Sequence, residues 1–461
     1  RDDVESRGLG DVYKRQDDRH LPSGKTGNER PALLPQVLRR RDCQQLGRTV
    51  QRPKCKPPMI SNVNKLIIWI LLFSCCWGIL PYQFVLLPVV FALYYMIKTI
   101  LERRPGMFKK YLIIYFIFFI ISAFSCMHFE DQSLSKTFTA VACLQLFPVI
   151  SYFIFLSGKY TIKEIEKALA IAYVIFLCCF TIQLIYPDKI FNLATDYMDI
   201  GRFTMYGQLI AYICLFYFYG KYLFSGKTKY LLYILPAFFV LFIAGFRTQM
   251  AAILLALGLF TYSVKKIASV KYMLLFLIVI GVLSQTSVVQ NSINNMMKRQ
   301  EAGATFANED YIRVIQFNYF TKEHFKSPVE YVFGSGIPNP RTKYGQPFYT
   351  VDPALGPYNG WQDWGIVGLS WMIGIPAVLA LLFPVLRIIR RKCDDNILFL
   401  KFFYIFLLLS SFTTVEFYRV GSFFFHGLLF YLYELYYRRS KHDNIGHTQK
   451  VLGQTRRVVN S

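Results

Sequence analysis

The sequence predicts an all-α, polytopic membrane protein with about twelve transmembrane helices and one long exported loop. Three observations carry this prediction. Long apolar runs follow one another along most of the chain, and the connections between them alternate between basic and nearly uncharged. A polar segment, residues 287–360, interrupts the series.

The apolar runs are the expected membrane-spanning helices. A helix needs about 20 apolar residues to cross a bilayer. Several runs are shorter, so the first two are equally compatible with a hairpin or with half-helices. The runs lie at 66–80, 82–97, 111–126, 138–156, 165–186, 203–224, 230–246, 249–264, 272–286, 364–386, 397–412 and 417–437.

Charge in the connections predicts the orientation, because short cytoplasmic loops hold an excess of Lys and Arg. The connections after the even-numbered runs are basic, and those after the odd-numbered runs, apart from the long polar loop after the ninth, are short and poor in cations. Both termini are therefore expected in the cytoplasm, and the long polar loop is expected to be exported. The basic connections contain Lys98, Lys159, Lys227, Lys265 and Arg387.

This topology also accounts for the formal net charge of +24. In a soluble protein such a charge would indicate a nucleic-acid partner. Here the basic residues lie at the inner edge of the membrane, where anionic lipid attracts them. They are not interleaved with aromatic residues on a soluble face, as a nucleic-acid site requires. The expected partner is membrane lipid, and no nucleic acid.

The chain divides into five expected segments. Its opening, residues 6–16, resembles translated adapter sequence from a sequencing library, so we expect the leader to be non-native and Met59 to be the true start; a disordered cytoplasmic tail is the alternative. The segments are a leader (1–58), nine transmembrane helices (59–286), a long exported loop with short helices (287–360), three transmembrane helices (361–437) and a cytoplasmic tail (438–461).

Cysteine and histidine usage argues against two kinds of site. The exported loop contains no cysteine, which excludes a domain held by disulfides. No Cys-x-x-Cys or His-rich spacing indicates a metal site, and we expect neither a metal nor a cofactor.

Arg247 is the first candidate functional residue. It lies in the break between the seventh and eighth runs, which is too short for a hydrated loop. A guanidinium at membrane depth is costly unless it meets an anion, so we expect a functional role. Alternatively, Arg247 extends to lipid headgroups or pairs with a carboxylate such as Glu416. Glu416 and Arg419 are themselves expected to pair near the site.

Arg313 is the second candidate. It belongs to a short amphipathic helix that is expected to lie along the membrane surface. The alternative is a solvated cation near Glu309, which would contribute little. The following sequence Gly334-Ser335-Gly336 could bring backbone amides close to a phosphate. A plain tight turn is the alternative.

These features together resemble the O-antigen polymerase and ligase superfamily, the Wzy-type polysaccharide polymerases and WaaL-type ligases. The resemblance rests on the order of short motifs and on their topology, and it covers most of residues 59–444. The motifs are Gly201-Arg202 entering one run, Phe246-Arg247-Thr248 between two runs, Arg313-x-x-Gln316 before Gly334-x-Gly336, and Asp363-Trp364-Gly365 opening the next run.

The resemblance implies a bacterial inner-membrane glycosyltransferase whose donor is an undecaprenyl-pyrophosphate-linked oligosaccharide. Arg247 and Arg313 would hold the pyrophosphate and stabilise the charge that develops as the glycosidic bond breaks. Arg202 and Arg341 would be secondary contacts. A chain-length regulator and a flippase would be protein partners. The donor stores the energy, so no cofactor is implied.

One departure favours polymerisation over ligation. Ligases of this superfamily carry a His-Asn or His-Ser pair shortly before the next span, whereas this chain has Tyr358-Asn359. Tyrosine, with an ordinary pKa near 10, is a poor base at neutral pH. Asp352 and His324 are the remaining candidate bases in the loop, and the alternative for each is an ordinary solvated loop residue. Trp361, Tyr344 and Tyr358 could stack on sugar rings.

We therefore expect a polymerase that joins lipid-linked repeat units of O-antigen or capsule. An O-antigen ligase and a lipid-linked oligosaccharide flippase remain alternatives. A polyprenyl-phosphate-dependent glycosyltransferase would be expected to carry acidic residues in its first exported loop, where this chain has Pro81 and Tyr82. A transporter would be expected to show internal repeats, and none is evident.

Overall fold

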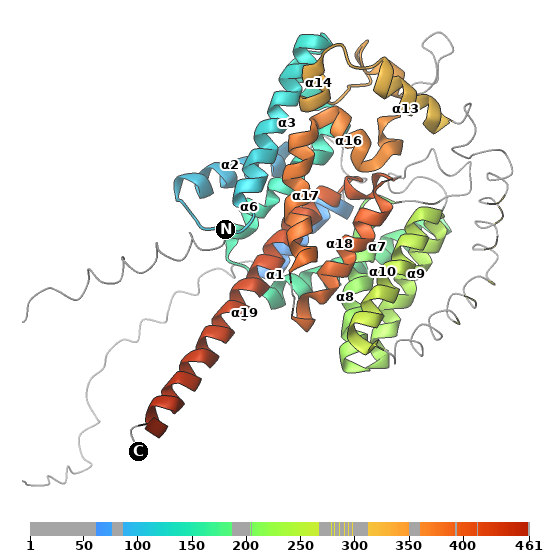
Figure 1. Cartoon of the computed structure of the whole chain (residues 1–461). Coiled ribbons are helices and arrows are strands. Elements are labelled where there is room, and N and C mark those ends of the chain that lie inside the picture. Colours follow the sequence, from blue (N-terminus) through green and yellow to red (C-terminus); the bar gives the residue numbers. More distant parts are fainter. Residues whose placement is uncertain are drawn as a thin grey trace, which may run out of the picture. The chain divides into compact units, whose positions relative to one another are not determined.

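The computed structural model describes residues 61–75, 86–186, 203, 205–266, 312–349, 360–391, 394–412 and 414–459, with single positions among 278–297. Every regular element in these ranges is a helix (Figure 1), which confirms the all-α prediction. The predicted leader at 1–58 and the ninth expected helix at 272–286 lie outside the described ranges, apart from isolated positions of the latter.

The first ten of these elements lead from the start of the described chain to α8. They are α1 (Asn62–Ile70), the π-helical η1 (Leu71–Cys75), α2 (Leu86–Leu101), α3 (Lys109–Phe129), α4 (Leu134–Thr139), α5 (Val141–Leu146), the 3-10 helix η4 (Phe147–Ile150), α6 (Ser151–Gly158), α7 (Ile162–Ile185) and α8 (Leu209–Ser225).

The remaining elements lead from the end of α8 to the C-terminus. They are η6 (Thr228–Tyr230), α9 (Leu231–Ala244), α10 (Arg247–Lys265), α13 (Ile312–Lys322), α14 (Pro328–Phe333), α15 (Gln346–Tyr349), η8 (Trp361–Trp364), α16 (Gly365–Ile373), α17 (Ile375–Arg390), η9 (Asp395–Ile397), α18 (Leu398–Ser410), η10 (Val415–Phe417) and α19 (Ser422–Val459).

Four stretches of the described chain are long and apolar enough to cross a bilayer: Lys109–Phe129, Val141–Gly158, Ile162–Ile185 and Thr248–Lys265. These support a membrane protein. The expected number of about twelve crossings is not reached by this criterion, because other apolar helices are shorter than a full crossing. The shorter helices include Asn62–Phe73, Pro88–Leu101, Leu209–Ser225 and Thr228–Ala244.

Two of the expected spans are interrupted. The helix expected at 138–156 begins at Val141, because Ala140 adopts an extended conformation after α4. The helix expected at 364–386 divides at Gly374, whose φ of 85° ends α16. Pro376 then lies in the first turn of α17, where its missing N–H costs nothing. The break leaves the last carbonyl groups of α16 without partners inside the helix.

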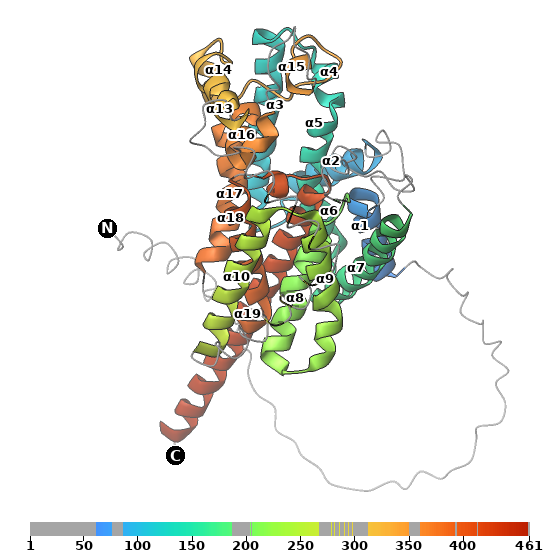
Figure 2. The same cartoon turned by 90° about the vertical axis from the view of Figure 1, so that its right-hand side faces the viewer.

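Helix packing brings distant parts of the sequence together (Figure 2). Residues of α3 contact α17, those of α10 contact α18, and the first half of α19 contacts α6 and η4. The interior is rich in aromatic rings; for example, Phe424 of α19 stacks on Phe73 with 4.8 Å between ring centroids. Further along the first half of α19, the buried carboxylate of Glu434 accepts hydrogen bonds from Met107 N (3.0 Å) and the Tyr152 hydroxyl.

The close contact between α16 and η8 depends on Gly368. A Cβ atom there would lie 1.8 Å from the carbonyl oxygen of Trp361. We expect Gly368→Ala to lower the free energy of unfolding by about 3 kcal/mol through overpacking. Thermal unfolding of the purified protein in detergent measures this loss.

Gly258→Ala in α10 is the matched control, because a Cβ atom there meets nothing within 4 Å. We expect this helical substitution to be neutral or to stabilise by up to about 1 kcal/mol. Equal losses in the two variants would contradict the importance of the α16–η8 contact.

Candidate functional site

The described part of the long polar loop folds into a compact layer of short helices, which we call the cap (residues 312–349). The cap comprises α13, α14 and α15. Figure 1 shows α13 and α14 beside α16 at one end of α3. Contacts join α14 to α3, α16 and α17, and α13 to η8. The cap is therefore built onto the helix ends rather than separated from them.

Backbone hydrogen bonds dock the cap at the break between α16 and α17. Ser335 N donates to Trp371 O at 3.0 Å, and Gly336 N donates to Met372 O at 2.8 Å. Gly334 and Gly336 have φ angles of 83° and 79°, which favour glycine. The glycine turn that could have cradled a phosphate thus uses these amides to satisfy the free carbonyls of α16.

The space around Gly334 and Gly336 also excludes any residue with a side chain. A Cβ atom on Gly334 would lie 2.4 Å from Met372 O, and one on Gly336 would lie 2.3 Å from the Cβ of Cys126. The backbone of the cap therefore approaches α16 and α3 more closely than any residue with a side chain would permit.

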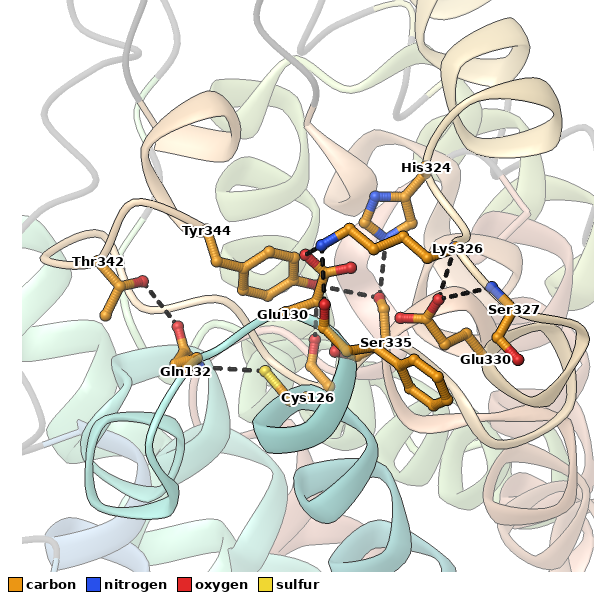
Figure 3. Close-up of polar contacts among 12 residues, drawn as sticks. Cys126, Glu130, Gln132, His324, Lys326, Ser327, Glu330, Ser335, Thr342 and Tyr344 are labelled. Atoms are coloured by element: carbon orange, nitrogen blue, oxygen red, sulfur yellow. Dashed lines mark hydrogen bonds and ion pairs between the residues drawn. The ribbon is translucent and has the colours of Figure 1, made fainter.

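Gln132 provides a second attachment, shown in Figure 3. Its amide nitrogen donates to Ile337 O and to Thr137 Oγ1, both at 2.8 Å. Its amide oxygen accepts from Asn339 N at 2.9 Å and from the Thr342 hydroxyl at 2.8 Å. One buried side chain between α3 and α4 thereby fixes the segment that follows the glycine turn.

Two glutamates and a lysine join the cap to the end of α3. Glu330 accepts from Lys326 N at 2.6 Å and from Ser327 N at 3.1 Å, forming the capping box of α14. Lys326 Nζ lies 2.8 Å from Glu130 Oε2. Burial raises the pKa of Glu130, and neighbouring Glu330 adds to this effect while Lys326 opposes it. The Oε1 atoms of Glu130 and Glu330 are buried without hydrogen-bond partners in the described structure.

His324 lies inside the cap. Its Nε2 atom is 2.8 Å from Ser335 Oγ, and its Nδ1 atom is 3.4 Å from the Tyr319 hydroxyl. Tyr344 donates to the same Ser335 hydroxyl at 3.0 Å. Burial lowers the pKa of His324 to about 3, so the ring is neutral at pH 7. A neutral, enclosed imidazole with such a low pKa is a weak base, and its contacts are those of a packing residue.

A separate group of charged and polar side chains comes from α13, η8, the segment around η10 and the start of α10. We call it the arginine cluster (Arg313, Asp363, Arg419, Glu416 and Gln249). At its α13 side, Gln316 Nε2 donates to Asp363 Oδ2 at 3.3 Å. Burial raises the pKa of Asp363, and the nearby Arg313 guanidinium partly opposes this rise.

At the other side of the cluster, Glu416 is completely buried. Its Oε1 atom accepts from Arg419 Nη2 and Gln249 Nε2, each at 2.5 Å, which confirms the expected pairing of Glu416 with Arg419. Its Oε2 atom is buried without a hydrogen-bond partner in the described structure. The Arg419 guanidinium also lies 5.1 Å from the centre of the Phe246 ring. The pair is thus enclosed between η10 and the start of α10.

An aromatic contact joins the two sides of the cluster. Trp361 of η8 is almost fully buried and stacks on Tyr418, with 5.5 Å between ring centroids. The Tyr418 hydroxyl donates to Gln362 O at 3.2 Å. The indole that we expected to stack on sugar therefore stacks on a ring of the protein itself.

Arg247 is the first residue of α10, two positions before Gln249. The turn from α9 contains only Gly245 and Phe246, which agrees with the prediction that no hydrated loop separates these helices. Phe203 N donates to Ile243 O at 3.3 Å, so the segment that follows Arg202 lies beside the end of α9. The side chain of Arg247 is outside the described structure, as are Arg202, Asp352, Tyr358 and Asn359.

Those expected site residues that the structure describes consequently fall into two groups. Arg313 and Trp361 belong to the arginine cluster or its lining, together with the backbone of Arg247. His324 and the exposed Arg341 belong to the cap, where Arg341 N donates to Asn339 Oδ1 at 3.0 Å. The sequence named Asp363 only as part of a motif of the resemblance, and it did not indicate Gln249 as a site residue. Each is a polar residue at the start of an apolar run.

Comparison of the chain with protein-family models, with curated proteins and with solved structures finds no match. Functional inference therefore depends on the geometry of the described residues and on the motif resemblance.

The buried His324 makes the stability of the cap depend on pH. A folded-state pKa of about 3 against an unfolded value of 6.5 gives stability that is present above pH 6.5 and is lost as the pH falls. We expect the free energy of cap opening to drop by about 2 kcal/mol between pH 7.5 and 5.0. Hydrogen exchange of residues 312–349 measures this drop.

The raised pKa of Glu130 has the opposite effect on cap stability, because it makes the folded cap more stable as the pH falls.

Comparison of wild type with His324→Gln separates the contribution of the histidine from that of Glu130. The variant should lose most of the pH dependence. His128→Gln, at an exposed histidine of α3, is the control and should keep it. A pH dependence that survives in His324→Gln would contradict the assignment.

Proposed function

We propose that this chain is a membrane-embedded glycosyltransferase that polymerises oligosaccharide repeat units carried on a lipid pyrophosphate. The observation that supports this best is the arginine cluster. Three segments far apart in sequence contribute to it: Arg313 of α13, Arg419 beside η10, and Gln249 in the first turn of α10. The motif order that resembles O-antigen polymerases involves Arg313 and also Arg247, the residue that opens α10.

Asp363 and Glu416 balance the two described arginines of the cluster, so we expect Arg247 to supply the net positive charge that a pyrophosphate requires. Arginine presents a planar fork of donors that remains charged at every relevant pH, and this fork matches phosphate oxygens. The first N–H groups of α10 and its helix dipole add a fixed positive potential at Arg247. Charge that accumulates on the leaving pyrophosphate would be stabilised there without rearrangement.

Asp363 is the best-placed base among the described residues. It lies beside Arg313, and burial raises its pKa, which makes the carboxylate a stronger base. In the proposed step, the acceptor hydroxyl oxygen bonds to the anomeric carbon of the donor sugar while its proton passes to Asp363. The bond from that carbon to the pyrophosphate oxygen breaks, and the lipid pyrophosphate leaves with the electron pair.

The arginine role predicts a specific glycan phenotype. In cells whose copy of this gene is deleted, wild type should restore a ladder of long glycan chains, whereas Arg313→Ala at equal protein level should leave single repeat units. Loss of one charge-assisted contact to the pyrophosphate should lower polymerisation by about 10² or more. Separation of the surface glycan by size measures this effect.

Arg390→Ala is the matched control, because Arg390 is exposed at the end of α17, away from the cluster. It should restore the ladder. Absence of all repeat units from the surface in Arg313→Ala would point instead to a ligase or flippase. A ladder unchanged in every variant would contradict the proposed function.

The base role predicts a pH effect. Asp363→Asn should lower the rate of polymer formation on purified lipid-linked repeat units by about 10² or more. The wild-type rate should fall on acidification at a pH above the ordinary aspartate pKa of 3.8, because the carboxylate must be unprotonated to act as a base. Asp363→Glu should retain part of the activity with a shifted pH profile. An identical profile in wild type and both variants would assign the base elsewhere.

A further inference from the structure

A groove of about 420 Å³ lies between α1, α2 and the end of α6, and it involves none of the residues of the arginine cluster or the cap. Its lining includes Asn62, Lys65 and Trp69 of α1, Tyr95 of α2, and Ser157 and Tyr160 on either side of the α6 terminus. Polar and aromatic groups thus converge on a cavity large enough for a phosphate headgroup.

The charges around the groove favour an anion. Lys65 faces it directly, and Lys159 follows the lining residue Gly158. Neither lysine takes part in the ion pairs found within the described residues. The neighbouring carboxylate of Glu164 accepts from Asn62 Nδ2 at 3.1 Å and from Thr161 N at 2.7 Å. These neutral donors hold Glu164 as an anion, so two ammonium groups stand against one carboxylate beside the groove.

The surface beside the groove is apolar. Ile68 on α1 is 48% exposed, and Phe91 and Ile97 on α2 are 45% and 54% exposed. The rings of Trp69 and Phe91 lie 6.2 Å apart and connect the groove with this surface. A polar cavity at the helix ends therefore passes into exposed aliphatic and aromatic side chains along the helices.

This arrangement matches the two parts of a phospholipid. Tryptophan, tyrosine and lysine at helix ends are typical of the membrane interface, and basic residues there attract anionic headgroups. We propose that the groove binds the phosphate headgroup of an anionic phospholipid through Lys65, with the acyl chains lying along the exposed faces of α1 and α2. The site is independent of the proposed glycan chemistry.

Native mass spectrometry of the full chain in detergent tests this site, with phosphatidylglycerol and phosphatidylcholine as probes. Wild type should retain phosphatidylglycerol in preference to phosphatidylcholine. Lys65→Gln should weaken phosphatidylglycerol binding about fivefold, since one lysine near an anionic headgroup contributes about this factor. Lys65→Arg should bind as wild type does, which separates loss of charge from loss of structure.

Lys227→Gln is the control, because Lys227 is exposed in the turn between α8 and η6. It should leave phosphatidylglycerol binding unchanged. Equal binding by wild type and Lys65→Gln, or equal weakening by Lys65→Gln and Lys227→Gln, would overturn the proposal. Complete competition by millimolar inorganic phosphate, with no preference between the two lipids, would show a free-phosphate site and overturn the lipid assignment.

Discussion

The break between α16 and α17 is the feature on which the cap and the placement of its neighbours depend. A helix that ends inside a protein must find partners for its last carbonyl groups. Here the amides of Ser335 and Gly336 supply them for Trp371 and Met372. The same contact fixes the cap, and the cap in turn places α13 against η8. Arg313 and Gln316 reach Asp363 because of that placement.

The arginine cluster shows how a charged group is tolerated in such an enclosed position. Burying a carboxylate costs several kcal/mol unless hydrogen bonds and an opposite charge offset the loss of water. The Oε1 atom of Glu416 receives donors from Arg419 and Gln249, whereas its Oε2 atom has no partner within the described residues. Removal of Glu416 would leave the Arg419 guanidinium without its counterion, a strongly destabilising change.

The sequence predicted those helices whose bounds depend only on a continuous run of apolar residues. α3 and α7 match their expected runs closely, because each is a long apolar stretch without an internal break. The division at Gly374 was not predicted, since Gly and Pro are common in membrane helices and their effect depends on the segment that packs against them. The tight turn before Arg247 was predicted, because too few residues separate the two apolar runs there.

The site was predictable only in part for a similar reason. Arg313 stood out as a cation in a short helix beside a polar loop, but its carboxylate neighbour lies some fifty residues further along the chain, and no local pattern indicates such a contact. His324 sits in a polar stretch of sequence, so its near-complete burial follows from the ring packing of the folded cap. The position of Asp363 beside Arg313 and the burial of His324 therefore depend on long-range packing, which the periodicity and composition of the sequence do not reveal.

The docking of the cap through main-chain groups has a consequence for sequence variation. Ser335 and Gly336 contribute amides, and Trp371 and Met372 contribute carbonyls, so this attachment constrains space at two glycines but not the identity of most side chains. Outward-facing positions such as Val329, Tyr331 and Val332 carry no part of the attachment. Homologous chains could therefore differ at these positions and present a different outer surface on the same backbone frame.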